Sequence, residues 1–230
     1  MRLGITDMED QDLSGFSVRP FPGCESIRQG NVALLPFDLD RDAESLWNSF
    51  GPEDALWTYM AYGPFADRKA FDEWLATRAA SQDPWHMTIE VDGTACGSMA
   101  YMALRPDMGV AEIGHVLLSA KLQQTRAATR AFALALSHLF ELGYRRVEWK
   151  CDARNQPSRR AALRLGFRFE GLFRQHMIVK GHNRDTAWFA LLDHEWPAMA
   201  RAIDLWLCDE NFDEAGRQRR RLAEIAVSLQ

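Results

Sequence analysis

The chain has 230 residues, 47% of them hydrophobic, and a formal net charge of −5 at neutral pH. This length suffices for one substantial hydrophobic core. The acidic balance argues against direct nucleic-acid binding, which needs a basic face. No stretch approaches the roughly 20 apolar residues of a membrane span, and the first residues lack a basic region followed by an apolar one. We therefore expect a cytoplasmic protein that does not enter a membrane.

The four cysteines are widely spaced and form no CxxC pair. Neither a zinc site nor a disulfide framework is indicated, and no metal is expected. Cys96 and Cys151 fall in apolar, strand-like segments, which predicts buried thiols.

The first third of the chain predicts an arm, one strand and three helices. Residues 1–28 are rich in glycine and proline, as in a tail or an arm packed on the body. A short strand at 32–37 precedes helices at 38–50 and 53–60. Asp67 is a good N-cap for a further helix that ends near residue 80.

Three strands follow. Residues 85–91 and 95–104 flank Asp92 and Gly93, two residues that tolerate positive φ and indicate a hairpin turn. The third strand, 110–119, is almost wholly apolar, as in a central strand covered on both faces.

The second half of the chain alternates helices and strands around a polar turn at 123–129. Glycines mark the ends of two helices, Gly143 and Gly166. The expected elements are a long helix up to Gly143, a strand at 145–152, a helix at 156–165, strands at 167–179 and 186–192, and a helix at 195–207. Residues 209–230 place acidic residues before arginines, which predicts a solvated helix. The alternatives for this tail are a cover for the active site or a dimer contact.

The turn at 123–129 carries the first functional signal. The first N–H groups of a helix have no partners within the helix, and the positive end of its dipole attracts anions. A strand, a polar turn and a long helix therefore predict a phosphate site, suited to a nucleotide-bearing cofactor.

Four signatures make the chain resemble the GNAT acyltransferase superfamily over residues 30–195, and in detail its branch that acetylates the N-terminal amines of ribosomal proteins. They are Glu112-Ile113-Gly114-His115, the turn at 123–129, Asn155-Gln156-Pro157-Ser158, and Leu165-Gly166-Phe167 with Glu170-Gly171. The resemblance implies an α/β fold with a mixed, mostly antiparallel twisted sheet. This sheet has about seven strands, splayed between the fourth and the fifth, and helices on both faces. The implied domains are an arm at 1–28, an acyltransferase domain at 29–195 and a helical extension at 196–230.

The resemblance also implies acetyl-CoA as co-substrate. Backbone groups on the splayed strand would pair with pantetheine, at Val116, Leu117 and Leu118, and an N–H of Leu117 or Leu118 would meet the oxyanion. The pyrophosphate would lie on the helix N-terminus, held by Gln123, Gln124, Thr125, Arg126, Ala127, Ala128 and Thr129.

Asn155 would contact the cofactor, and Ser158 would return a proton to the departing thiolate. The alternative is that Asn155 caps a helix and Ser158 is an ordinary first-turn residue. Arg159 and Arg160 are candidates for the 3′-phosphate.

Arg126 departs from the family pattern, because glycine usually stands there and lets backbone approach phosphate. We expect Arg126 to fold outward and add a cation, with hydroxyls from Thr125 and Thr129. The alternative is a degenerate turn that no longer binds CoA.

Acyl transfer to an amine needs a neutral nucleophile, and therefore a general base, acting directly or through water. Glu112 is the leading candidate, since burial in an apolar strand raises the proton affinity of a carboxylate. The alternative is a structural carboxylate paired with an arginine or lysine. His115 and His176 are reserves.

The sequence says less about the identity of the acceptor. Five aromatic residues lie in segments that line the acceptor side in related proteins: Trp57, Tyr59, Tyr62, Phe65 and Trp85. They are either core residues or a platform for an amine-bearing substrate. Glu148, Lys150 and Asp152 form a second candidate patch. We expect a small amine-bearing molecule or a protein N-terminus as acceptor, and a monomer or homodimer. The rival hypotheses are a noncatalytic acyl-CoA-binding module, a transferase for succinyl-CoA or another donor, and a thiol hydrolase built on Cys151 and Asp152.

Overall fold

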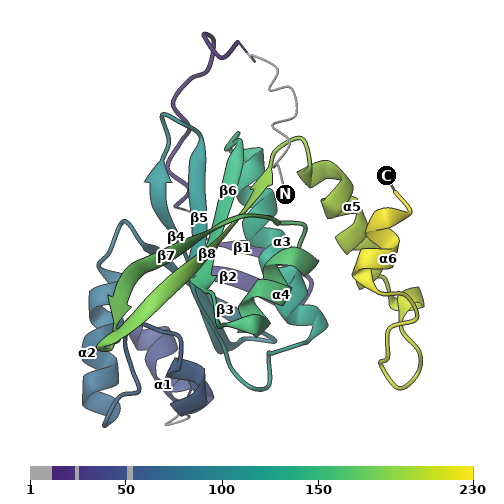
Figure 1. Ribbon diagram of the computed structural model, residues 1–230. Coiled ribbons are helices and arrows are strands. Elements are labelled where there is room, and N and C mark those ends of the chain that lie inside the picture. Colours follow the sequence, from purple (N-terminus) through teal and green to yellow (C-terminus); the bar gives the residue numbers. More distant parts are fainter. Residues whose placement is uncertain (1–11, 24–25, 51–53, 230) are drawn as a thin grey trace.

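The computed structural model describes residues 12–23, 26–50 and 54–229, and its centre is one eight-stranded sheet (Figure 1). The strand order is β1-β2-β3-β4-β5-β6-β8-β7, and every pairing is antiparallel except that of β5 with β6. The strands are β1 (Ile27–Gln29), β2 (Val32–Pro36), β3 (Trp85–Val91), β4 (Thr94–Arg105), β5 (Val110–Leu118), β6 (Arg146–Asp152), β7 (Arg168–Val179) and β8 (His182–Leu192). The predicted mixed, mostly antiparallel sheet is confirmed. It has one strand more than expected because Ile27–Gln29 pairs with β2.

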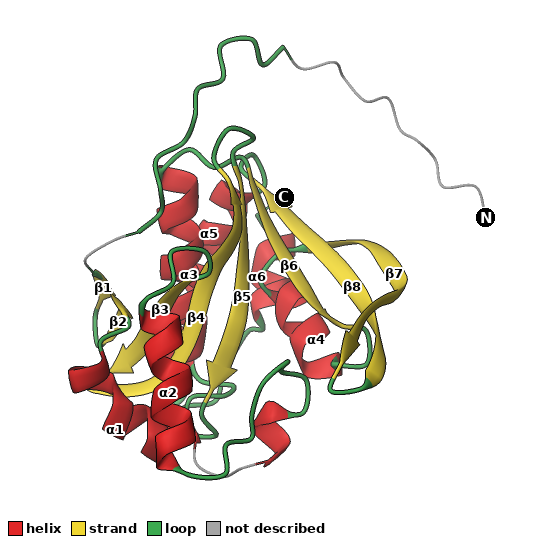
Figure 2. Ribbon diagram, turned by 90° about the vertical axis from the view of Figure 1, so that its left-hand side faces the viewer, coloured by secondary structure: helices red, strands yellow, loops and turns green. Residues whose placement is uncertain are grey.

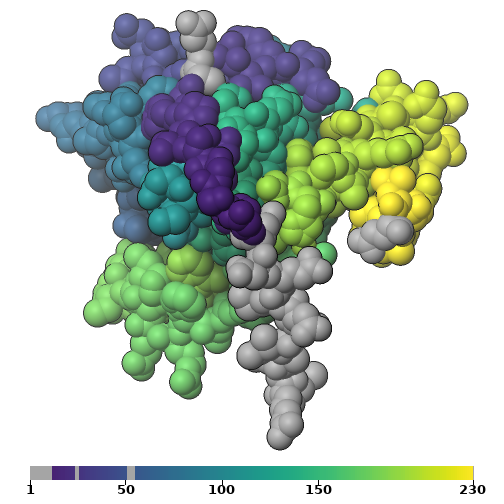
Figure 3. Space-filling view, turned by 90° about the horizontal axis from the view of Figure 1, so that it is seen from above, coloured from purple at the N-terminus to yellow at the C-terminus, as the bar shows by residue number. Residues whose placement is uncertain are grey.

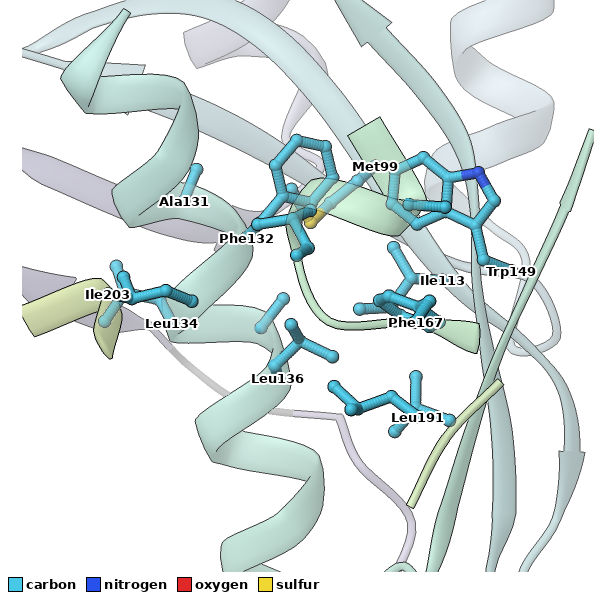
Figure 4. Close-up of a cluster of buried hydrophobic side chains, with 14 of the residues drawn as sticks. Met99, Ile113, Ala131, Phe132, Leu134, Leu136, Trp149, Phe167, Leu191 and Ile203 are labelled. Atoms are coloured by element: carbon cyan, nitrogen blue, oxygen red, sulfur yellow. The ribbon is translucent and has the colours of Figure 1, made fainter. Parts of the chain in front are cut away.

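Helices cover both faces of the sheet, as predicted. They are α1 (Leu39–Phe50), α2 (Arg68–Ala79), α3 (Arg126–Glu141), α4 (Gln156–Arg164), α5 (Trp196–Leu207) and α6 (Leu222–Val227), with 3-10 turns η1 (Asp54–Trp57) and η2 (Asp209–Asn211). α1 and α2 enclose an aromatic cluster around Trp57 and Phe71. α3 and α5 pack over the main core, where Phe132, Trp149 and Phe167 meet (Figure 4). No helix of the described residues is long and apolar enough to cross a membrane.

Local sequence explains most element ends. The N-cap of α2 is Asp67, whose Oδ1 accepts from the N–H of Ala70 at 2.9 Å. Asp92 and Gly93 form the turn of the β3–β4 hairpin with φ of 51° and 77°. Glycine, asparagine and aspartate tolerate such positive φ values better than other residues. These turn and cap predictions are confirmed.

The separation of β5 from β6 positions the site. Their parallel pairing runs only from Val110 and Arg146 to Glu112 and Glu148. β6 pairs instead with β8 along its whole length, so the two strands close at one end and diverge at the other (Figure 2). On β5 the divergence comes with an irregularity opposite Ser98 and Ala100. At this point His115 has a positive φ of 51°. An irregular register at such a residue is typical of a β-bulge, which bends the strand.

The prediction of one solvated helix over residues 209–230 is wrong for the described part of this tail. η2 is followed by a loop in which Asp213 accepts from the backbone N–H groups of Ala215 and Arg217. Gly216 has φ of 72°, so the chain turns instead of continuing as a helix. α6 then buries Leu222 and Ile225. Residues 196–229, the C-terminal extension, stand out from the side of the body (Figure 3).

Residues 12–23 lie against the body. The N–H of Arg19 donates to Pro106 O at 3.0 Å, and the Tyr144 hydroxyl donates to Pro20 O at 3.1 Å. Residues 1–11 of the predicted arm, and Glu53 at the start of the predicted helix 53–60, lie outside the described residues.

Candidate active site

A groove of about 1180 Å³ lies where the N-terminus of α3, the helix α4 and the C-terminal extension meet. Its lining includes seven of the residues predicted to bind the cofactor, Leu118, Gln124, Thr125, Arg126, Ala127, Ala128 and Thr129. The other predicted residues, Val116, Leu117, Gln123, Asn155, Ser158 and Glu112, are not part of this lining. The structure therefore brings the expected phosphate-binding residues except Gln123 to one groove, and the lining of this groove does not include the expected thiol and base residues.

The N-terminus of α3 presents unpartnered backbone donors. Thr125 caps the helix through Oγ1, which accepts from the N–H of Ala128 at 3.1 Å. The hydrogen bonds of the described residues leave the N–H groups of Gln124, Arg126 and Ala127 without an acceptor. Such a set of free donors at a helix start is suited to an anion.

The hydroxyls of Thr125 and Thr129, expected to help bind phosphate, already have partners. Thr125 Oγ1 donates to Leu122 O at 2.7 Å, and Thr129 Oγ1 accepts from Nη1 of Arg164 at 3.1 Å. Gln123 is also engaged, since its Nε2 donates to Leu118 O at 2.9 Å and ties the turn to the end of β5. These three side chains shape the turn, and the backbone supplies its free donors.

Arg126 points away from the turn. Its guanidinium donates to Leu207 O and, at 2.7 Å, to Oδ1 of Asp209, and it lies 4.3 Å from the ring centroid of Phe212. The outward orientation leaves the backbone of the turn open where the family usually has glycine. It also ties α3 to the C-terminal extension.

Asn155 and Ser158 lie at the start of α4. Oδ1 of Asn155 accepts from the N–H of Ser158 at 3.1 Å, so Asn155 is a helix cap, and its amide NH₂ remains as a donor. Trp149 Nε1 donates to Ser158 Oγ at 2.9 Å. Because an indole N–H can only donate, the hydroxyl hydrogen of Ser158 is left to point elsewhere.

Glu112 lies at the last paired position before β5 and β6 separate, and it is 5% exposed. Lys150 Nζ approaches its Oε2 to 2.8 Å, which gives the carboxylate the cationic partner that the structural alternative required. Burial raises the pKa of Glu112, against the opposing charge of Lys150.

Glu148 lies opposite Glu112 in the register and behaves differently. Burial opposes its ionised form, but its hydrogen bond from Arg146 and the charges of Lys150 and Arg105 outweigh burial and lower the pKa of Glu148. Arg105 and Arg146 approach its Oε1 to 2.9 and 3.0 Å. The pKa values of these two neighbouring carboxylates are therefore shifted in opposite directions.

The reserve histidines have ordinary partners. His115 Nδ1 lies 3.1 Å from the Tyr62 hydroxyl, and burial lowers the pKa of His115 to about 4. His176 Nδ1 lies 3.0 Å from Thr186 Oγ1.

Most acceptor-side aromatics belong to the packed cluster of α1 and α2, including Trp57, Tyr62 and Phe65. Cys151 is buried, and burial raises the pKa of its thiol, which disfavours a thiolate nucleophile. Among the described residues, no three His, Cys, Asp or Glu side chains gather to hold a metal ion.

Sequence reasoning missed two kinds of residue in the groove. Arg164 lines it together with Arg160, and their spacing of four places both on one helix face, a signal that was available. Trp206, Asp209 and Phe212 also line it. The sequence offered a cover for the active site only as an alternative for residues 209–230, and no feature marked these three residues as lining a groove.

Residues 31–168 match the family model described as an acetyltransferase (GNAT) domain. A GCN5-related N-acetyltransferase from Brucella melitensis is 42% identical, with 94% of this chain and 100% of that chain covered, and a TM-score of 0.91. A crystal structure described as a probable acetyltransferase (GNAT family) from Chromobacterium violaceum is 41% identical, with 84% and 98% covered and a TM-score of 0.78.

A curated relative agrees with the expected ribosomal-protein branch. It is the "Putative ribosomal N-acetyltransferase YdaF" of Bacillus subtilis (strain 168), 30% identical over 106 residues. The match covers 46% of this chain and 57% of the relative, so it spans little more than half of that protein's length.

Proposed function

Because the chain belongs to the GNAT acetyltransferase family, we propose that it transfers an acetyl group from acetyl-CoA to a primary amine by direct attack in a ternary complex. One observation carries the proposal. The free N–H groups at the start of α3 line the same groove as Leu118, in the part of β5 that no longer pairs with β6. An anion-binding helix start next to unpaired strand backbone suits a ligand that has both phosphates and amide groups.

The residues of the chain divide into two tasks. Gln124, Arg126 and Ala127 offer backbone donors to the pyrophosphate, and the part of β5 beyond Glu112, at Val116, Leu117 and Leu118, offers backbone to pantetheine. Asn155 holds the start of α4, where Ser158 faces the thiol end. Acetyl-CoA supplies the thioester.

Glu112 is the proposed general base. The amine must lose a proton before or while its nitrogen forms the new C–N bond, and the C–S bond breaks as the thiolate leaves. Glu112 receives the amine proton, directly or through water, and Ser158 donates its hydroxyl proton to the thiolate. Ser158 then regains a proton from solvent water, and Glu112 releases its proton to solvent, so that both groups return to their starting state. The raised pKa of Glu112 suits this task, because a base works best when its pKa approaches the operating pH.

For the acceptor, we propose a protein N-terminal amine, which the similarity to the putative ribosomal N-acetyltransferase YdaF favours. An amino acid or a small aminoacylated molecule is the alternative within the same chemistry.

The test begins with thermal stabilisation by CoA, acetyl-CoA and succinyl-CoA, followed by thiol release across a panel of amines that includes N-terminal peptides. Glu112→Gln should lower kcat about 100-fold, within the range of general base catalysis, with unchanged CoA affinity. The matched control is Glu90→Gln, whose carboxylate pairs with Arg28 on β1 and should leave kcat unchanged. Stabilisation by CoA without turnover of any amine would favour the noncatalytic binding module. No stabilisation by any of the three would contradict both.

A further inference from the structure

Arg78 is an arginine without a counter-ion, and it lies outside the groove, whose lining contains Arg126, Arg130, Arg160 and Arg164. It belongs to the last turn of α2, and its side chain is partly exposed while its Nε is buried. Its guanidinium forms no hydrogen bond or ion pair with any of the described residues. A cation in the last turn stabilises a helix, but this alone does not explain a buried donor without an acceptor.

Two aromatic rings fix the position of this guanidinium. It lies 5.0 Å from the ring centroid of Tyr62 and 5.8 Å from that of Trp74, and the centroids of these two rings are 5.0 Å apart. Nε1 of Trp74, which can only donate, is also buried without an acceptor in the described part of the chain. Because the rings hold the guanidinium in place, little further ordering is needed when an anion binds.

A series of contacts connects Arg78 to the segment of β5 that carries Glu112. The Tyr62 ring stacks on the His115 ring with centroids 5.7 Å apart, and its hydroxyl lies 3.1 Å from Nδ1 of His115. His115 follows Glu112 by three residues, and its ring lies 5.1 Å from that of His86 on β3. Arg78 is thus joined to β5 through Tyr62 and His115.

The strand register places these contacts on the same face of the sheet as Glu112. His86 pairs with Ala100, Ala100 pairs with Gly114, and Glu112 precedes Gly114 by two residues. Side chains two residues apart on a strand point to the same face, so His86 and Glu112 share one. Arg78 therefore lies on the side of the sheet where the proposed base is to receive the amine proton.

The groups around Arg78 do not neutralise its charge. The nearby titratable rings are those of His86 and His115. Burial and the charge of Arg78 lower the pKa of His115 to about 4, and the same causes together with His115 lower the pKa of His86 to about 3. Both rings are neutral at neutral pH, and no carboxylate of the described residues pairs with Arg78. A positive charge of this kind attracts an anionic ligand.

We propose that Arg78, held by Tyr62 and Trp74, is a carboxylate subsite of the acceptor site, so that the preferred acceptor is an amine that also carries a carboxylate. The inference rests on the proposed function for the reaction, and it names the class of acceptor. The planar guanidinium matches a carboxylate through two parallel hydrogen bonds. The carboxylate belongs either to an acidic side chain near a protein N-terminus or to a free amino acid.

The experiment measures kcat/KM on the full chain at saturating acetyl-CoA, with rates corrected for the fraction of neutral amine. One arm compares peptides that have Glu or Gln at their second and third positions, and the other compares amino acids with their α-amides. In at least one arm, wild type should prefer the carboxylate by about tenfold to a hundredfold, as expected for a charge-assisted hydrogen bond. The arm that shows the preference identifies the source of the carboxylate.

Arg78→Met should remove this preference and leave kcat/KM for the uncharged acceptors and the KM for acetyl-CoA nearly unchanged. Arg78→Lys keeps the charge without the planar fork and should retain part of the preference. The matched control is Lys69→Met, which removes the same charge from an exposed position on the same helix and should keep the full preference. Tyr62→Phe loses the hydroxyl next to His115 and should reduce the preference less than Arg78→Met.

The outcomes separate the inference from the proposed function. Equal kcat/KM for carboxylate and amide acceptors in both arms would overturn the subsite while leaving acetyl transfer intact, and this comparison needs no variant. An equal loss for charged and uncharged acceptors in Arg78→Met would also overturn it, since Arg78 would then act on folding. Absence of turnover for every amine would overturn the proposed function, and the subsite with it.

Discussion

The groove at the start of α3 and the opening between β5 and β6 differ in how their charged side chains are paired. In the groove, three of four arginines have no carboxylate partner among the described residues, and the one lining aspartate is engaged by Arg126. At the opening, the buried Glu112 and Glu148 share Lys150, and Glu148 also receives Arg105 and Arg146. Arginines without a carboxylate partner leave a surface on which an anionic ligand can pair with them. Buried carboxylates with cationic partners are instead groups whose pKa values the protein itself sets.

The same contrast extends to how each region is held. The groove is assembled from segments far apart in the chain, and its contacts involve exposed side chains such as Asp209, which is 91% exposed. The opening is built from adjacent strands with buried side chains. Changes at the opening should therefore alter stability, and changes in the groove should alter ligand affinity with little effect on stability.

The largest expected effect is a loss of folding stability when a charged side chain at the opening is replaced. Lys150→Met would leave Glu112 without its cation at 2.8 Å and should lower the free energy of unfolding by about 3 kcal/mol, the usual cost of breaking a buried pair. Urea denaturation measures it. The control Lys69→Met breaks the exposed pair with Glu73 at 3.8 Å and should change stability by less than about 1 kcal/mol. Similar losses for the two variants would show that the opening is not a buried charge cluster.

A second prediction uses pH to separate the two carboxylates. Because the pKa of Glu112 is raised above 4.5, its contribution to stability is present below that value and is lost as pH rises through the folded pKa. The pKa of Glu148 is lowered, so its contribution is present above 4.5 and is lost as pH falls through the folded pKa.

Urea denaturation between about pH 4 and 7 tests both signs. Relative to wild type, Glu112→Gln should become more stable as pH rises, and Glu148→Gln should become less stable. Differences with the same sign for both variants would refute the opposite pKa shifts.

A third prediction compares two helix caps. Thr125→Ala and Asp67→Ala should each lower stability by about 1 kcal/mol, since each side chain caps a helix through one backbone N–H. Only Thr125→Ala should also weaken CoA binding, because only that helix start lines the groove. Equal CoA affinity of the two variants would remove the start of α3 from the ligand site.

The smallest expected effect lies in the groove. Asp209→Asn removes the one negative charge of the lining and should raise CoA affinity about twofold to fivefold at low salt, with the gain fading as salt is added. Thermal stability should hardly change, because the pair with Arg126 is exposed. Glu210→Gln, a neighbour on η2 outside the lining, should raise the affinity less. An equal gain for both would mean that general charge, not the groove, decides the affinity.

Much of the fold was readable from residues that act locally. Asp67, Asp92 and Gly93 predicted a helix start and a hairpin turn because caps and positive φ depend on the residue itself and its near neighbours. The alternation in β6 likewise placed Val147 and Trp149 on the core side and Glu148 and Lys150 on the other. The GNAT motifs extended this to the separation of β5 and β6 and to the turn at 123–129.

The tail shows where local reasoning failed. Its charge pattern predicted one solvated helix, but Asp213 and Gly216 form a turn, and α6 packs against α5 with Leu222 and Ile225 buried. A charge gradient indicates only that a helix would be tolerated. It gives no information about which apolar residues find a partner surface.

By itself, the sequence determined most of the order of elements and the family, because these depend on local geometry and on motifs. Anion binding by the turn at 123–129 stays a prediction. The tertiary structure alone decided which charges meet. It pairs Glu112 with Lys150, and it brings Asp209 to Arg126 although they are 83 positions apart in the chain. It also sets Arg164 over Trp206. Such contacts depend on how whole helices and strands dock, and docking follows from the summed burial of many side chains rather than from any one residue.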